Sequence, residues 1–182
     1  MEGSHRSDPD RVQLVRGSEA DIPSLEPLWV AVHHIHAASM PELAPYVSDE
    51  ETWREHRELY RELFRKPKTF LFLARARGEL VGYALGHIVG SAESWWSDTW
   101  RTGDRVGELE SISVLPKHRG AGIGSALLDA VDAEFARLGV DDQVIGVLPG
   151  NVEAIRLYER RGFRPTWLYL SRFAGHDRTP SG

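Results

Sequence analysis

The stretch that most constrains the fold of this chain covers residues 108–124 and reads ELESISVLPKHRGAGIG. Its first eight residues alternate and include β-branched side chains, which predicts a strand, and Pro116 ends this strand because proline has no N–H for the sheet. Three glycines follow at alternate positions: Gly120, Gly122 and Gly124. Residues 125–128 then open an amphipathic helix. A strand, a glycine-rich loop and a helix start in this order present backbone N–H groups and the positive end of a helix dipole, which predicts a phosphate-binding cradle.

The spacing of these glycines excludes two common phosphate-binding motifs. A dinucleotide fingerprint requires Gly-x-Gly-x-x-Gly, but the third position counted from Gly120 falls on Ser125. A P-loop requires a lysine after its last glycine, and no lysine follows these glycines. The cradle is therefore of neither the dinucleotide nor the nucleoside-triphosphate type.

The complete string resembles the pyrophosphate-binding motif Arg/Gln-x-x-Gly-x-Gly/Ala of the GNAT superfamily of acyl-CoA-dependent N-acyltransferases. The resemblance implies that the cosubstrate is acetyl-CoA or a related acyl-CoA. It implies that the pyrophosphate is bound by the backbone amides of Gly120, Ala121, Gly122, Ile123, Gly124 and Ser125, with Arg119 and Lys117 near enough to add charge. It also implies that the backbone of Ile112, Ser113 and Val114 pairs with the pantetheine as with an added strand. The alternative is that these residues only form a tight connection between strand and helix.

A second segment, residues 151–163, resembles the part of this family that contacts the pantetheine and the sulfur. The resemblance implies that Asn151 binds the pantetheine and that the hydroxyl of Tyr158 lies beside the sulfur. A thiol has a pKa of about 8.5, so the departing thiolate gains from a proton or a hydrogen bond, and we expect Tyr158 to be the general acid. The alternatives are a helix N-cap for Asn151 and a core aromatic for Tyr158.

Two glutamates on the predicted strand are candidates for the general base. An alkyl amine with a pKa of about 10.4 is almost wholly protonated at pH 7, so unassisted deprotonation adds roughly 4.6 kcal/mol to the barrier. Glu108 and Glu110 are predicted to share one strand face with Ile112 and Val114, unless a bulge intervenes. Burial on that face raises the pKa of a carboxyl group. The alternative for each is an exposed or ion-paired glutamate, and we expect that at least one is the base.

Clustered histidines and tryptophans offer weaker signals. His33 and His36 share a helix face, but two imidazoles without a carboxylate make a poor metal site, so we expect these residues and His34 to line the acceptor pocket or to pack, and we expect no metal. Six aromatic residues are candidates for a wall around the acceptor: Trp53, Trp95, Trp96, Trp100, Trp167 and Tyr169. Tryptophans in loops also anchor loops to a core or form dimer contacts.

The composition limits the partners. A net charge of −5 and a pI of about 5.9 argue against nucleic acid, since no basic stripe is present. Cysteine is absent, which excludes disulfides, thiolate metal sites and a covalent cysteine intermediate, and so favours direct attack by the acceptor. No apolar run approaches the ~18 residues that cross a bilayer, and residues 1–10 lack the apolar segment of a signal peptide. We expect a cytoplasmic protein without a membrane partner.

The periodicity predicts one α/β domain over residues 11–174, a disordered leader over residues 1–10 and a frayed tail over residues 175–182. Strands are predicted at residues 12–16, 69–75, 80–87, 108–115, 142–147 and 166–173, with an irregular loop over residues 90–104. Helices are predicted from about Asp21, with Pro27 bending the helix or delaying its start, between Ser48 and Pro67, over residues 125–138, and between Asn151 and Gly162. The order β-α-α-β-β-β-α-β-α-β describes a mixed sheet with helices on both faces, which is similar to the GNAT fold.

The resemblance implies an N-acetyltransferase that moves an acetyl group from acetyl-CoA to a primary amine within a ternary complex. We expect a small-molecule acceptor and leave its identity open. The alternatives are a peptide or protein acceptor, which predicts an open groove between the first two helices and the final strand, and a sensor that binds acyl-CoA without catalysis. A homodimer is possible because dimers are frequent in the family.

Overall fold

The computed structural model describes residues 12–94 and 96–172. Five strands form one sheet in chain order: β1 (Gln13–Gly17), β2 (Phe70–Ala76), β3 (Glu79–Gly90), β4 (Arg105–Val114) and β5 (Asp142–Ile145). The α-helices of this part are α1 (Glu26–Ser39), α2 (Asp49–Arg65), α3 (Ile123–Arg137) and α4 (Val152–Glu159). Short 3-10 helices connect them: η1 (Glu19–Leu25), η2 (Pro41–Leu43), η3 (Ser91–Glu93) and η4 (Pro116–His118).

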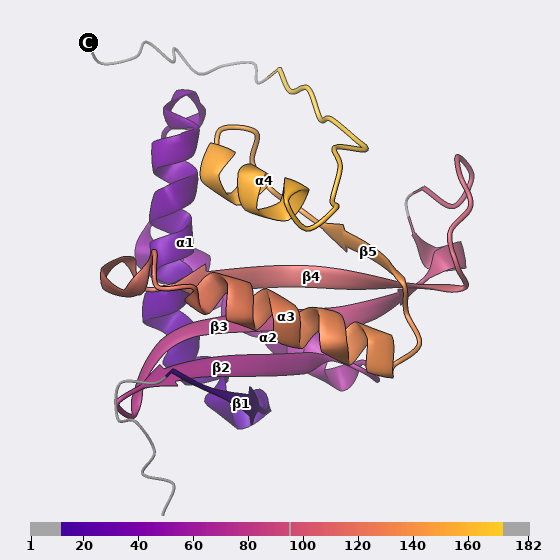
Figure 1. Cartoon of the computed structure of the whole chain (residues 1–182). Coiled ribbons are helices and arrows are strands. Elements are labelled where there is room, and N and C mark those ends of the chain that lie inside the picture. Colours follow the sequence, from indigo (N-terminus) through magenta and orange to yellow (C-terminus); the bar gives the residue numbers. More distant parts are fainter. Residues whose placement is uncertain (1–11, 95, 173–182) are drawn as a thin grey trace, which may run out of the picture.

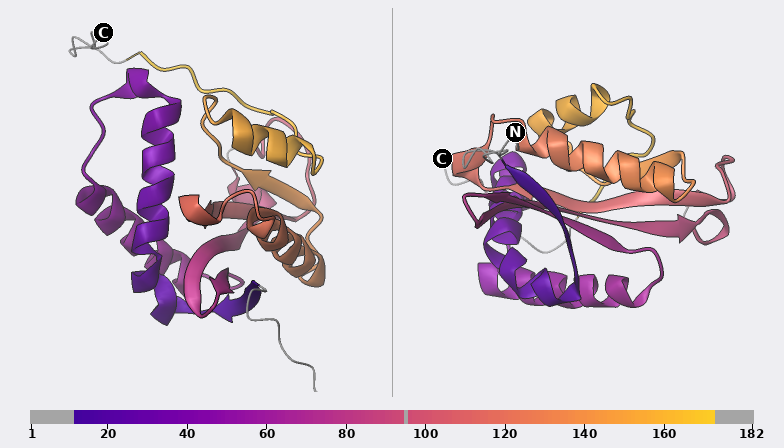
Figure 2. Two further views of the ribbon diagram at one scale, coloured as in Figure 1. Left: turned by 60° about the vertical axis from the view of Figure 1, so that its left-hand side comes forward. Right: turned by 60° about the horizontal axis from the view of Figure 1, so that its bottom comes forward.

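The sheet lies between two helical layers, as predicted (Figure 1). Figure 2 shows α3 and α4 over one face and α1 and α2 over the other. Phe70, Leu127 and Phe135 belong to the apolar cluster beneath α3, and Trp29 and Leu71 belong to the cluster beneath α1 and α2. Burying one such large apolar side chain contributes about 1.5–3 kcal/mol, so the two clusters hold the layers together.

The central strand β4 changes its pattern partway along its length. Strands β1 to β4 are antiparallel neighbours, and β5 pairs with β4 in parallel over residues 106–109 of β4. Leu85 of β3 pairs with Ser111, whereas the next residue of β3 pairs with Leu109, so Glu110 is an extra residue and forms a β-bulge. Figure 1 shows β5 diverging from β4 toward α4. The sheet is therefore split beyond residue 109 of β4.

Several local signals act as the sequence predicts. Ser48 caps α2 by accepting a hydrogen bond from the N–H of Glu51 at 3.2 Å. The first α-helix is delayed until Glu26, with Pro27 in its first turn, where a missing N–H costs no helix bond. Gly139 ends α3 in the left-handed region at φ +69. These positions agree because each depends on neighbours in the chain.

Other boundaries differ from the prediction. The prediction of a final strand over residues 166–173 is wrong where the structure describes it, because residues 166–172 form no strand. The side chains of residues 167–170 are 53–88% exposed, so their alternation has no sheet edge or covering layer to pack against. Strand β5 ends at Ile145, before the predicted residue 147, and β4 begins at Arg105, before the predicted residue 108. The predicted leader and the tail lie outside the described residues. None of the described helices is both long and apolar enough to cross a membrane.

Candidate active site

The glycine-rich loop between η4 and α3 forms an open cradle of backbone N–H groups. Gly120 and Gly122 have φ of +77 and +79, a conformation that favours glycine, and a Cβ added at either position meets no atom within 4 Å. The N–H of Ala126 bonds to the carbonyl of Gly122 at 3.0 Å, which closes the first turn of α3. Within the described chain, no protein group accepts a hydrogen bond from the N–H groups of residues 120–125. The donors that the sequence predicts for a diphosphate are therefore free.

Two cations near the cradle behave differently. The Nε of Arg119 donates to the carbonyl of Val114 at 3.0 Å, which holds this guanidinium beside the end of β4. Arg119 also borders a groove of about 370 Å³ that is lined mainly by apolar side chains of α1. Lys117 instead forms an exposed ion pair with Glu79 at 2.6 Å. The structure thus places Arg119 at the cradle and holds Lys117 in a separate contact.

The split between β4 and β5 exposes one backbone edge. Ile112, Ser113 and Val114 pair with β3 on one side, while β5 pairs only with residues 106–109 and leaves their other side without a described strand partner. The hydroxyl of Ser113 donates to the carbonyl of Leu28 at 2.8 Å and ties α1 to this strand. The edge is therefore firmly held and, apart from the carbonyl of Val114 that accepts from Arg119, available to pair with an extended ligand.

Helix α4 carries the second predicted pair. Asn151 caps the helix, because its side chain accepts a hydrogen bond from the N–H of Ala154 at 3.3 Å. Tyr158 is 7% exposed and belongs to the apolar cluster that also contains Ile123 at the start of α3. Burial raises the pKa of Tyr158 to about 12. Asn151 is thus a helix N-cap and Tyr158 a core aromatic, which are the alternatives to a functional role. Neither of these structural roles prevents a contact with a ligand.

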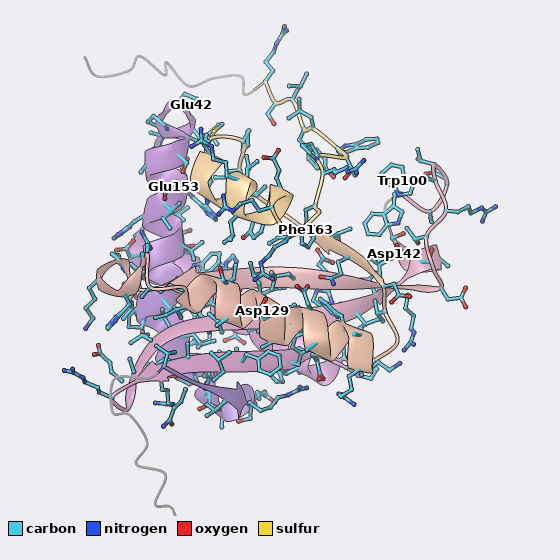
Figure 3. The ribbon with its side chains drawn as sticks, in the orientation of Figure 1. Glu42, Trp100, Asp129, Asp142, Glu153 and Phe163 are labelled. Carbon is cyan, nitrogen blue, oxygen red and sulfur yellow. The ribbon has the colours of Figure 1, made fainter. Side chains whose placement is uncertain are left out.

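A residue that the sequence analysis missed connects α4 to α3. Arg161 donates to the carbonyl of Ser125 at 2.9 Å and pairs with Asp129 at 2.7 Å and Asp132 at 3.1 Å. Figure 3 shows Asp129 on α3 below α4. Because Ser125 is in the first turn of α3, this contact fixes α4 against the cradle. An arginine just beyond α4 and two acidic residues on α3 are too common to predict such a link.

The β-bulge decides where the two glutamates point. Leu109 and Ile112 both pack toward α3, whereas Glu108 and Glu110 both approach His87 from the opposite face. The prediction that the glutamates share a face with each other is confirmed. The prediction that Ile112 and Val114 share that face is wrong, because the extra residue reverses the alternation beyond it.

His87 on β3 brings the two carboxylates together. Its Nε2 lies 3.6 Å from Glu108 and 3.5 Å from Glu110. Burial raises the pKa of Glu108; His87 opposes this shift and Glu110 adds to it. A histidine in an apolar strand gives no local signal, and only the register of β3 against β4 shows that it faces the glutamates.

A buried hydroxyl group cluster supports the bulge. The hydroxyl of Tyr60 on α2 lies 2.8 Å from that of Tyr83 and 2.7 Å from the Oγ of Ser111. Burial raises the pKa of Tyr83 to about 12, so this group is neutral at ordinary pH. The cluster fixes α2 against the bulge next to Glu110.

The histidines of α1 have structural partners. His33 is hydrogen bonded to the carbonyl of Val47 at 3.0 Å, and His34 to Asp49 at 3.0 Å. The ring of His36 lies edge-on to Trp29. These contacts support ordinary packing, one of the two expected roles.

The aromatic residues do not form one wall. Trp53 is buried beneath α1 and α2, whereas Tyr169 is exposed. Trp96 and Trp100 stack at 6.3 Å, and Trp167 lies 6.5 Å from Trp100. Figure 3 shows Trp100 at the same end of the sheet as Asp142, where β5 begins. These three anchor the loop before β4, and Trp95 lies outside the described residues.

Comparison with known proteins agrees with this geometry. The profile of the acetyltransferase (GNAT) family matches residues 29–163. The mycothiol acetyltransferase of Thermobispora bispora is 30% identical over 138 residues, 76% of this chain and 42% of that protein. The aminoglycoside N(6')-acetyltransferase type 1 of Klebsiella pneumoniae is 29% identical over 99 residues, 50% of this chain and 46% of that protein. The chain spans less than half the length of these two curated relatives.

A solved structure shows the same fold. A putative acetyl transferase from Pyrococcus furiosus superposes with a TM-score of 0.67 at 25% identity, over 89% of this chain and 99% of that chain.

Proposed function

Because the chain belongs to the acetyltransferase (GNAT) family, we propose that it transfers an acetyl group from acetyl-CoA to a primary amine of a small molecule. The acceptor attacks the thioester directly, within a ternary complex. The observation that carries this proposal is the row of free N–H groups over residues 120–125, next to the open edge of β4. A cytoplasmic location and a homodimer stay predictions from the sequence.

The residues present fit acetyl-CoA. The free N–H groups and the dipole of α3 suit a diphosphate, and the positive φ of Gly120 and Gly122 lets the backbone approach it without a side chain in between. The free edge of residues 112–114 suits the amides of the pantetheine, which can pair as a strand does. Arg119 at the end of β4 adds positive charge between these two parts.

The reaction requires one proton to leave the amine and one donor for the sulfur. Acetyl-CoA supplies a thioester, whose C–S bond breaks as the C–N bond forms. Glu108 takes the proton from the amine, directly or through water, and Glu110 lies close enough to substitute for it or to hold the ammonium form. Tyr158 donates to the sulfur. A pKa of about 12 keeps its hydroxyl protonated, and it is too weak an acid to lose the proton fully to a thiolate, so a hydrogen bond is its main contribution.

The acceptor class follows from the relatives and the charges. The names of two relatives describe acetylation of mycothiol and of aminoglycosides, both small molecules. Two carboxylates side by side attract an acceptor that carries a protonated amine. We therefore propose a small cationic amine as the acceptor.

Isothermal titration with acetyl-CoA tests the cofactor site. The native chain is expected to bind with micromolar affinity, and Gly122→Asp to bind at least about 100-fold more weakly, because a carboxylate then faces the diphosphate. Gly78→Asp is the matched control, since Gly78 has nearly the same φ of +82 and an equally open position in a remote hairpin. Equal affinity in both variants and in the native chain contradicts the proposal.

Turnover separates the enzyme from a sensor that only binds acyl-CoA. A panel of small amines, amino acids, aminoglycosides and peptides is incubated with acetyl-CoA, and the released thiol is measured. The proposal expects thiol release with at least one small cationic amine and transfer of the acetyl group to its nitrogen, checked by mass spectrometry. Tight binding of acetyl-CoA without turnover on any amine supports the sensor instead.

A further inference from the structure

Three side chains that commonly bind metals converge on the face of the sheet opposite α3. The Nε2 of His87 and one oxygen each from Glu108 and Glu110 all lie within 4.8 Å of one another. His87 belongs to β3 and the glutamates to β4, so three backbone positions in adjacent strands fix the group. Among the described residues, this is the only group of three or more potential ligands.

The distances suit a metal better than hydrogen bonds. The two contacts of Nε2, at 3.6 and 3.5 Å, are longer than the ~2.7–3.2 Å of a hydrogen bond. The ligand atoms of a tetrahedral zinc ion, with bonds of about 2.0–2.2 Å, stand roughly 3.3–3.5 Å apart. The two distances from Nε2 are therefore close to those between atoms arranged around a shared ion.

The histidine itself indicates a missing partner. His87 is 5% exposed, and neither ring nitrogen has a hydrogen-bond partner within the described residues. A buried imidazole without a partner costs free energy unless something binds it. The side chains of Glu108 and Glu110 are 38% and 20% exposed, so solvent reaches the two carboxylates, whereas the Nε2 of His87 is buried behind them.

We propose that His87, Glu108 and Glu110 form a Zn²⁺ site with one open coordination position. One imidazole nitrogen and two carboxylate oxygens are ordinary zinc ligands, and the two negative charges balance the ion. This departs from the expectation of no metal, because the sequence gives no sign that His87 meets the glutamates. Among the described residues the Nδ1 of His87 has no acceptor, and the lack of such support weakens zinc binding about 10–100-fold, so we expect micromolar affinity.

Zinc at this point blocks acetyl transfer. This consequence depends on the proposed function, in which Glu108 accepts the proton of the amine. The lone pairs that bind the ion cannot accept that proton, and the bound cation repels an ammonium group. Zinc then acts as a reversible inhibitor whose site is separate from the phosphate cradle.

Zinc binding is measured directly on the full chain, by competition between the protein and a chromophoric chelator for ZnCl₂. One ion per chain with micromolar affinity is expected. His87→Gln and Glu110→Gln are each expected to weaken binding at least about tenfold. His34→Gln is the matched control, because His34 faces one exposed carboxylate, and its affinity is expected to equal that of the native chain. The absorption spectrum of bound Co²⁺ is expected to be that of a tetrahedral ion.

Several results overturn the site. These are no binding by the native chain below about 100 µM Zn²⁺, native affinity in both His87→Gln and Glu110→Gln, or a spectrum of six-coordinate Co²⁺. If His87→Gln does not fold, as judged by circular dichroism, Glu110→Gln carries the test.

The inhibition is tested separately. Zinc is expected to stop thiol release and a chelator to restore it, while acetyl-CoA binding stays unchanged. Zinc binding with undiminished turnover overturns the inhibition. Absence of acetyl-CoA binding instead contradicts the proposed function and leaves the zinc measurement valid.

Discussion

The two sides of the candidate active site are built in different ways. The cofactor side comprises the edge of residues 112–114, the cradle of residues 120–125 and α4, and most of its proposed contacts come from the backbone. The acceptor side comprises His87, Glu108 and Glu110, and its contacts come from side chains of two strands. Backbone groups are placed by local conformation, and side chains by register between strands. The cofactor side can therefore be predicted from a short sequence motif, whereas the acceptor side is apparent only in the folded sheet.

The difference also separates binding from chemistry. Changes on the cofactor side should alter the affinity for acetyl-CoA, while changes on the acceptor side should alter turnover alone. Tyr158 is an exception, since it lies on the cofactor side and is proposed to act on the leaving sulfur. The four variants below test this separation, in order of decreasing expected effect.

Glu108→Gln should break the acceptor side alone. Losing a general base lowers kcat/KM by about 10²–10⁴-fold, whereas the dissociation constant of acetyl-CoA should change less than about twofold. Steady-state kinetics and isothermal titration measure the two quantities, and Glu55→Gln, an exposed glutamate of α2, is the control. A fall of less than about tenfold assigns the base to another residue, and Glu110→Gln is then the variant to measure.

Tyr158→Phe should lower kcat by about 10–100-fold and leave acetyl-CoA binding intact, because it removes a hydrogen bond to the departing sulfur and keeps the ring. The pKa of about 12 predicts no loss of activity through ionisation of this tyrosine up to about pH 10. Tyr46→Phe, in the connection before α2, is the control, because its hydroxyl donates to the carbonyl of Met40. Full turnover at saturating acceptor shows that the sulfur leaves without help from Tyr158.

Arg161→Met should weaken the cofactor side without touching its ligand contacts. The variant loses the hydrogen bond to the carbonyl of Ser125 and two ion pairs on α3, so acetyl-CoA affinity should fall about 3–10-fold and the free energy of unfolding by about 1–3 kcal/mol. Titration and urea denaturation measure these changes. Arg160→Met, at the adjacent exposed position, should change neither. Native affinity in Arg161→Met means that the cradle keeps its shape without this link.

Glu134→Gln should affect neither side and change stability alone. Hydrogen bonds from Arg137, and then from Arg16 on β1, lower the pKa of Glu134 to about 2. Because the pKa is lower in the folded state, the ionised Glu134 stabilises the fold fully at pH values above the pKa of the unfolded state, about 4.5. This stabilisation declines as the pH falls toward 2. At pH 7 the variant should unfold with about 1–3 kcal/mol less free energy, and the difference should shrink between pH 5 and 3. Urea denaturation measures both values, with Glu62→Gln as the control. A difference that does not depend on pH contradicts the role of the charge.

The sequence predicts the parts of this molecule that depend on near neighbours. The strand, glycines and helix over residues 108–124, the cap of α2 and the late start of α1 are all present, since each is set within a few residues. The shared face of Glu108 and Glu110 follows from their spacing of two.

The remaining features depend on contacts that the sequence does not show. The bulge at Glu110 follows from the pairing of β4 with β3 and from the hydroxyl cluster of Tyr60, Tyr83 and Ser111. The position of His87 follows from the same pairing. Residues 166–172 alternate as a strand does, but a strand also needs a partner edge, which these residues lack in the described structure.

A single surplus residue in β4 joins the two sides of this site. Upstream of Glu110 the even-numbered Glu108 faces α2, whereas downstream the even-numbered Ile112 and Val114 face α3, so the alternation changes phase at Glu110. Leu109 and Ser111 already pair with neighbouring residues of β3, so deleting Glu110 would restore regular pairing and leave the other side chains of β4 on their present faces. A deletion at the bulge can therefore remove one carboxylate of the acceptor side and leave the coenzyme edge in place, whereas a deletion elsewhere in β4 would turn part of the strand over.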